Sequence, residues 1–136
     1  MKGIIVLIAM IFLHVFADYG MQGILASMKQ REWWNLGEGK SKYRNDYKAA
    51  LIAHSFEWAF VVMLPCTIEL WKTMNHRHFI LYLILFVDMC IWHYIVDDGK
   101  ANVKDLNLIQ DQLLHIVQIL ITWLCWTLAS GWWCML

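Results

Sequence analysis

The chain has 136 residues, of which 60% are hydrophobic and only 16% are charged, and its formal net charge is zero. This composition excludes an ordinary soluble domain, and four membrane-spanning helices of roughly 20 residues use nearly the whole chain, so we predict one integral membrane domain over residues 1–136. The absence of net charge, with basic residues mixed among acidic ones, also argues against nucleic-acid binding.

Four apolar runs predict four transmembrane helices joined by short connections. The first is predicted over residues 3–27 and the second over residues 47–71, where Pro65 should kink the helix. The third is predicted over residues 78–97. The fourth is predicted over residues 106–132, with tryptophans toward its far end forming an interfacial belt. The predicted fold class is all-α, a four-transmembrane-helix bundle.

Basic residues are concentrated in the connections that follow the first and third predicted spans. These connections hold eight of the eleven lysines and arginines: Lys29, Arg31, Lys40, Lys42, Arg44, Lys48, Lys100 and Lys104. Because cytoplasmic loops of membrane proteins are enriched in Lys and Arg, both connections are predicted to face the cytoplasm and both termini to face outward. The first connection also contains Trp33 and Trp34, which suggests a short interfacial segment followed by a polar loop.

A short pattern, His-x-x-x-Asp-x-Gly, ends the first and the third predicted spans. It occurs at residues 14–20 and again at residues 93–99, and the span that follows each copy has a histidine near its start, His54 or His115. Because the first and third spans must run in the same direction, the pattern suggests two parallel helical hairpins related by an axis along the membrane normal.

Histidines and aspartates of the predicted spans form pairs that share a helix face, because residues four apart lie about 6 Å apart along the helix axis. The pairs are His14 with Asp18, His93 with Asp97, and Asp111 with His115. In an up-down-up-down bundle all three pairs, together with His54, lie at one level near the cytoplasmic side. Ionisable groups gathered in a low dielectric are unfavourable unless they are paired, neutralised or bound to a cation.

This residue set predicts an intramembrane metal site. Neutral imidazole and carboxylate oxygen are ligands for Zn²⁺, Mn²⁺ or Fe²⁺, and four-helix bundles hold such metals with inward-facing side chains. The predicted metal ligands are His14, Asp18, His93, Asp97 and Asp111, and the predicted catalytic groups are His54, His115 and Lys100.

An alternative interpretation makes each His/Asp pair a hydrogen bond between helices, Gln22 a further such bond, and Lys100 or Lys104 a helix-end ion pair with Asp97. Asp88, which is about half a turn around the helix from Asp97, is predicted to lie outside the site.

The combination of motifs consists of His14-x-x-x-Asp18-x-x-x-Gln22, His54, and His93-x-x-x-Asp97-x-x-Lys100. It resembles an uncharacterised family of small polytopic membrane proteins of bacteria and their phages. The resemblance covers nearly the whole chain and implies a multi-pass protein of the bacterial inner membrane, without implying a reaction. A looser similarity is to inner-membrane proteins regarded as metal-dependent hydrolases, whose complete ligand set is not matched here.

Three functions follow as hypotheses. The first is a metal-dependent hydrolase of a phosphoester or lipid head group, in which the cation lowers the pKa of its bound water and Lys100 helps to bind the anionic group. The second is a non-enzymatic bacterial or phage membrane factor that acts on the host envelope or on other phages. The third is an ion or proton transporter, although polar residues at one level do not form a path across the bilayer. The expected partners are the bilayer and, for the hydrolase, a lipid or phosphoester substrate; a homo-oligomer stays open.

Overall fold

The computed structural model describes residues 2–34, 43–73 and 75–130, and these residues contain helices and no strand. The elements are α1 (Lys2–Val15), η1 (Phe16–Met21), α2 (Leu25–Met28), η2 (Arg31–Trp34), α3 (Asp46–Val62), α4 (Leu64–Thr73), α5 (His76–Asp98), η4 (Gly99–Val103) and α6 (Leu108–Ala129). The predicted all-α class is confirmed.

Within the described residues, three helical segments are long and apolar enough to cross a membrane: Gly3–Met21, His76–Val103 and Leu108–Ala129. Helices α3 and α4 form a fourth span if the bent pair is counted as one. Large apolar side chains such as Phe12 and Ile84 are exposed along these helices, as expected of surfaces that face lipid. The structure is consistent with a multi-pass membrane protein.

The bend between α3 and α4 is 56° and lies at the proline that the sequence marks. Pro65 has no N–H to donate to the carbonyl of Val61, and its ring would clash with that carbonyl in a straight helix. The chain therefore breaks at Met63. The Met63 carbonyl accepts hydrogen bonds from both the backbone N–H and the hydroxyl of Thr67, at 2.9 and 3.0 Å.

The predicted first span is too long at its C-terminal end. The apolar helix ends at Met21, not at residue 27, because Gly23 adopts φ +46°, a conformation that turns the chain and that L-residues rarely adopt. The residues that follow form the short helices α2 and η2. The rest of the predicted polar loop, residues 35–42, lies outside the described residues.

Helix α6 begins with a capping box between Asn107 and Gln110, which explains why it starts at Leu108. The predicted tryptophan belt near its end is only partly described. Trp126 is buried in the core and does not face the membrane boundary, whereas Trp132 and Trp133 lie outside the described residues.

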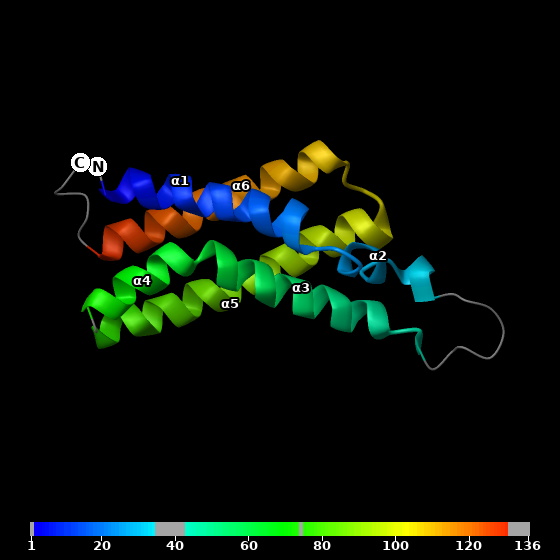
Figure 1. Ribbon diagram of the computed structural model, residues 1–136, viewed down its shortest axis with the longest axis horizontal. Coiled ribbons are helices and arrows are strands. Elements are labelled where there is room, and N and C mark those ends of the chain that lie inside the picture. The colour runs from blue at the N-terminus through cyan, green and yellow to red at the C-terminus, as the bar shows by residue number, and fades with distance from the viewer. Residues whose placement is uncertain (1, 35–42, 74, 131–136) are drawn as a thin grey trace.

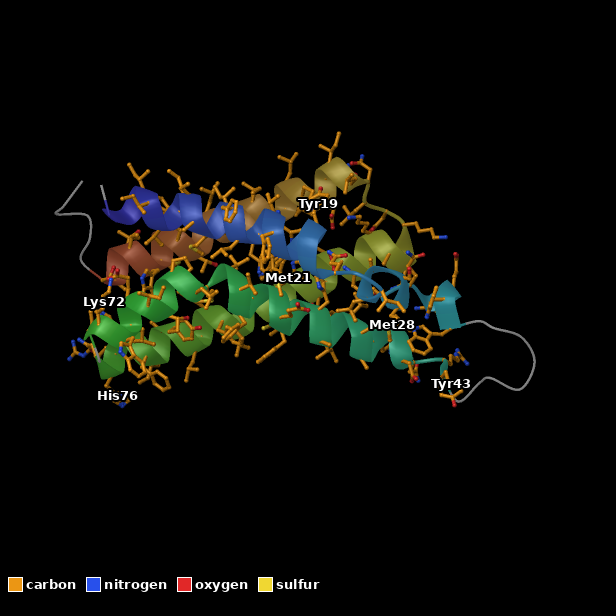
Figure 2. All side chains as sticks on the ribbon, in the orientation of Figure 1. Tyr19, Met21, Met28, Tyr43, Lys72 and His76 are labelled. Carbon is orange, nitrogen blue, oxygen red and sulfur yellow. The ribbon has the colours of Figure 1, made fainter. Side chains whose placement is uncertain are left out.

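The long helices lie side by side, with α3 packed against α5, α5 against α6, and α1 against both α3 and α6. Figure 1 shows the start of α1, the end of α6 and the α4–α5 connection at one end of the molecule, and α2 with the η4–α6 connection at the other. We call the second end the α2 end. In Figure 2, Lys72 and His76 mark the first end, and Met28 and Tyr43 mark the α2 end.

Candidate functional site

Both copies of the His-x-x-x-Asp-x-Gly pattern lie where an α-helix passes into a wider π-helix. His14 belongs to α1 and Asp18 to the π-helix η1, while His93 and Asp97 belong to α5, just before the π-helix η4. π-Helical turns are rare and are found frequently at functional sites. The widened turns therefore coincide with the residues that the sequence singles out.

The structure brings seven of the predicted site residues together in one buried cluster, toward the α2 end. We call it the His/Asp cluster: His14, Asp18, His54, His93, Asp97, Asp111 and His115. The four histidines are at most 1% exposed, and the three aspartates at most 8%. Figure 2 shows Tyr19 and Met21, which follow Asp18, between the two ends of the molecule. Groups from α1, η1, α3, α5 and α6 thus share one interior region.

One part of the cluster is centred on His54 and His93. Asp18 Oδ1 lies 3.4 Å from His54 Nε2 and 3.8 Å from His93 Nε2. Asp97 Oδ2 lies 3.6 Å from His54 Nε2 and 3.5 Å from His93 Nε2. Two carboxylate oxygens and two imidazole nitrogens, supplied by three separate helical segments, therefore face one another.

The other part is centred on His115. Its Nε2 lies 3.5 Å from Asp97 Oδ1 and 3.4 Å from Asp111 Oδ1. The His115 ring stacks on that of His93 with centroids 4.2 Å apart, and the Trp58 ring also stacks on His93, with centroids 4.0 Å apart. Stacking fixes the His93 ring plane and the direction of its Nε2.

Several of the nitrogen and oxygen atoms of the cluster lack hydrogen-bond partners although they are fully buried. Within the described part of the chain, His93 Nε2, His115 Nε2 and Asp111 Oδ1 have none. Nearly all buried polar atoms in proteins are hydrogen-bonded, so such atoms need an explanation. Bound metal is one, since three sets of three could hold an ion: Asp18, His54 and His93; His93, Asp97 and His115; Asp18, Asp111 and His115.

His14, a predicted metal ligand, belongs to none of these three sets, and both of its ring nitrogens have other partners. Trp58 Nε1 donates to Nδ1 at 3.0 Å, so the proton lies on Nε2, which donates to Gln112 Oε1 at 3.1 Å. The Gln112 amide in turn donates to Asp18 Oδ2 and Asp111 Oδ2, at 2.9 and 3.0 Å. His14 therefore orients two carboxylates through Gln112.

Two lysines neutralise part of the cluster's negative charge. Lys29, which follows α2 and is 6% exposed, donates to Asp97 Oδ2 at 2.5 Å, and Lys100 donates to Asp111 Oδ2 at 2.6 Å. The alternative pairing of Asp97 with Lys100 or Lys104 is wrong, because Lys29 holds that place. With neutral histidines, three carboxylates and two ammonium groups leave one negative charge in a low-dielectric interior, which favours a bound cation.

A pocket of about 530 Å³ opens beside the cluster at the α2 end. Its wall includes Lys29, Lys100 and Lys104, together with Gln22 and Asp97. The Gln22 amide lies 3.1 Å from Asp18 Oδ1 and 3.2 Å from His54 Nε2, so it links two helical segments as the alternative interpretation expects. The pocket is therefore basic and reaches the cluster through Asp97 and Gln22.

Lys104 lies at the exposed rim and donates to Glu32 Oε1 at 2.7 Å. This hydrogen bond and the nearby positive charge lower the pKa of the exposed Glu32 carboxyl below its ordinary value. The connection after the first span is thereby joined to the connection after the third, and the two connections frame the pocket.

Sequence reasoning missed Lys29, Trp58 and Gln112 as parts of the site. Trp58 follows His54 by four residues on α3, so the spacing that identified the other pairs marks it too. Nothing local distinguishes Lys29 from the other basic residues of its connection. Asp88 is exposed on α5, and no contact joins it to the cluster among the described residues.

Comparison of the chain with protein-family models, with curated proteins and with solved structures found no match. The features that indicate the chemistry of the site are its own donors, charges and pocket. Those features are a buried set of imidazoles and carboxylates and an adjoining lysine-lined pocket.

Proposed function

We propose that this is a four-helix-bundle protein of the bacterial inner membrane whose His/Asp cluster binds a divalent cation and hydrolyses a phosphoester, most simply on a lipid head group. The observation that carries the proposal is the basic pocket whose wall includes Asp97 of the cluster. A phosphate bound by the lysines would lie directly beside the candidate metal ligands. The excess of basic residues at the α2 end favours its placement at the cytoplasmic face, where head groups and water meet.

Distances within the cluster fit a small divalent ion. Tetrahedral ligation with bonds of about 2.0–2.1 Å places ligand atoms roughly 3.4 Å from one another. The four distances that join Asp18 and Asp97 to His54 and His93 run from 3.4 to 3.8 Å, close to this spacing, and Asp18, His54 and His93 form one of the three sets that could hold an ion. Mixed nitrogen and oxygen donors suit Zn²⁺, Mn²⁺ or Fe²⁺ and do not select among them.

The proposed reaction needs no oxidant or further cofactor. A divalent cation lowers the pKa of bound water toward about 7 and so supplies hydroxide at neutral pH. The water oxygen bonds to phosphorus, the bond from phosphorus to the alcohol oxygen breaks, and the alcohol takes up the proton. Lys29, Lys100 and Lys104 would bind the phosphate oxygens, and Gln112 would hold Asp18 and Asp111 in place.

A non-enzymatic membrane factor is the second candidate, and hydrogen bonds between helices favour it. Gln118 donates to the Met89 carbonyl at 3.0 Å, and Trp58 donates to His14, so polar side chains also specify how the helices pack. A transporter has less support, because no charged residue of the described part of the chain is buried toward the other end, where Met10 and Met63 are fully buried. Proton flux across the membranes of liposomes that contain the protein would support the transporter hypothesis.

The test combines metal content with hydrolysis. Protein purified in detergent without chelator is analysed by mass spectrometry for metals, and is then assayed on p-nitrophenyl phosphate and on phosphatidic acid vesicles, with released phosphate measured. We expect bound divalent metal and metal-dependent release in the wild-type protein, and loss of both in His93→Ala. The control, His76→Ala, removes an exposed histidine at the opposite end and should keep both.

Wild-type protein that contains no metal after purification and after incubation with Zn²⁺, Mn²⁺ or Fe²⁺ would remove the hydrolase proposal. Retention of a helical fold in that protein, with unaltered function after isosteric replacement of Asp97 by asparagine, would instead favour the structural role.

A further inference from the structure

The carboxylate of Asp97 faces two different groups of donors with its two oxygens. Oδ2 lies 3.6 and 3.5 Å from the Nε2 atoms of His54 and His93, whereas Oδ1 lies 3.5 Å from Nε2 of His115. A carboxylate in this position has one oxygen available to each of two neighbouring ions. Its hydrogen bond from Lys29 uses only one lone pair of Oδ2 and leaves the other for a metal.

A single ion does not use all of the buried donors. An ion held by Asp18, His54, His93 and Asp97 Oδ2 would already have four ligands, the number in a tetrahedral site. It leaves His115 Nε2 and Asp111 Oδ1 without partners, although both residues are fully buried. Burial of unpartnered polar atoms is costly, so the second group of donors calls for a ligand of its own.

From this geometry we infer a binuclear centre in which Asp97 bridges two divalent ions. One ion would be held by Asp18, His54 and His93, and the other by Asp111 and His115. The inference rests on the proposed function, because it presupposes that the cluster binds metal. The ions of two-metal hydrolytic sites lie about 3.5–4 Å apart. The rings of His93 and His115, one from each group of donors, are stacked with centroids 4.2 Å apart, which is close to that spacing.

A second ion also explains the basic pocket beside an acidic cluster. Three aspartates and two lysines leave one negative charge, so two divalent ions make the centre strongly positive. An anionic substrate and a hydroxide restore neutrality. In two-metal sites the ions stabilise both the attacking and the leaving oxygen of a phosphoryl group. The binuclear centre thereby favours one class of substrate, a phosphate ester whose negative oxygens bind to both ions.

The experiment counts Mn²⁺ ions. Metal-free protein in detergent is equilibrated with Mn²⁺, unbound ion is removed, and bound Mn²⁺ per chain is measured by mass spectrometry. Electron paramagnetic resonance of the same sample reports whether the ions are exchange-coupled. We expect two Mn²⁺ per chain with the spectrum of a coupled pair, and one uncoupled Mn²⁺ in Asp111→Asn. The matched control, Asp88→Asn, removes an exposed carboxylate on α5 and should retain two coupled ions.

The possible outcomes separate this inference from the proposed function. One uncoupled Mn²⁺ in the wild-type protein, unchanged in Asp111→Asn, would overturn the binuclear centre and leave metal-dependent hydrolysis standing. No bound Mn²⁺, Zn²⁺ or Fe²⁺ would overturn both. If Asp111→Asn does not fold, the spectrum of the wild-type protein still decides between one ion and a coupled pair.

Discussion

Replacement of Lys29 by methionine probes the charge balance of the His/Asp cluster. Lys29 Nζ donates to Asp97 Oδ2, and the two residues are only 6% and 4% exposed. Removal of one partner from a buried ion pair costs about 3–5 kcal/mol, because the remaining charge loses its compensation. We therefore expect metal-free Lys29→Met to lose about that much free energy of unfolding. Methionine retains the apolar length of the side chain, so little of the loss comes from packing.

Divalent metal should reverse much of this loss. A ligand that binds only the folded state stabilises it by mass action, and Asp97 without its ammonium partner attracts a cation more strongly. The stabilisation produced by added Mn²⁺ should therefore be larger in Lys29→Met than in the wild-type protein. Lys104→Met is the matched control: its ammonium group pairs with Glu32 at the exposed rim, so stability in either condition should not change measurably.

The assay is equilibrium unfolding in mixed micelles with increasing SDS, followed by tryptophan fluorescence, once with chelator and once with Mn²⁺. Equal stability losses in Lys29→Met and Lys104→Met would refute the reasoning. So would a Lys29→Met protein whose loss is the same with Mn²⁺ as with chelator, because Asp97 would then contribute nothing to cation binding.

Three further predictions concern the surroundings of the cluster. Trp58→Phe keeps an aromatic ring but leaves His14 Nδ1 without its donor, so unfolding should be easier by about 1–3 kcal/mol, and unchanged stability would contradict the assigned hydrogen bond. Gly23→Ala should cost about 1–2 kcal/mol by the same assay, because an L-residue is strained at φ +46°. No atom lies within 4 Å of the added methyl group, so the cost is this strain alone, and no loss would contradict the turn. Carbon-13 NMR should show that Glu32 titrates below its ordinary pKa, and the Lys104 contact should be lost as the pH falls through this lowered pKa. Lys104→Met should restore ordinary titration.

The approximate spans follow from hydropathy because lipid selects long apolar helices, but their ends depend on local backbone conformation. Gly23 illustrates the limit. A glycine marks freedom to turn and does not reveal that the turn occurs, so the sequence predicts a helix to residue 27 where the structure ends it at Met21. The bend at Pro65 was predictable because proline makes a straight helix sterically unfavourable whatever the neighbouring helices do.

The site residues also divide into those that the sequence predicts and those that only the tertiary structure reveals. Spacing alone brings the His/Asp pairs to shared faces, and that requirement is local. Lys29 depends on the turn at Gly23, after which the residue that follows α2 contacts Asp97 of α5, 68 positions further along the chain. Gln112 is the immediate neighbour of Asp111 and so belongs to a different face by helical period, yet its long side chain reaches His14 and Asp18 on the neighbouring segments. Contacts of this kind require the packed tertiary structure.

The cluster lies toward the α2 end (Figure 2), and in a bundle that spans a membrane this position would bring charged partners within its reach. At the α2 end, lysines that lie next to the connections can reach the buried aspartates, as Lys29 and Lys100 do, whereas around Met10 and Met63 no charged residue is buried among the described residues. Under the proposed function, the pocket at this end would admit ions and phosphate groups without a path through the hydrocarbon. A cluster midway between the two ends would lack this access, which is why we propose chemistry at the head-group level and not transport across the membrane.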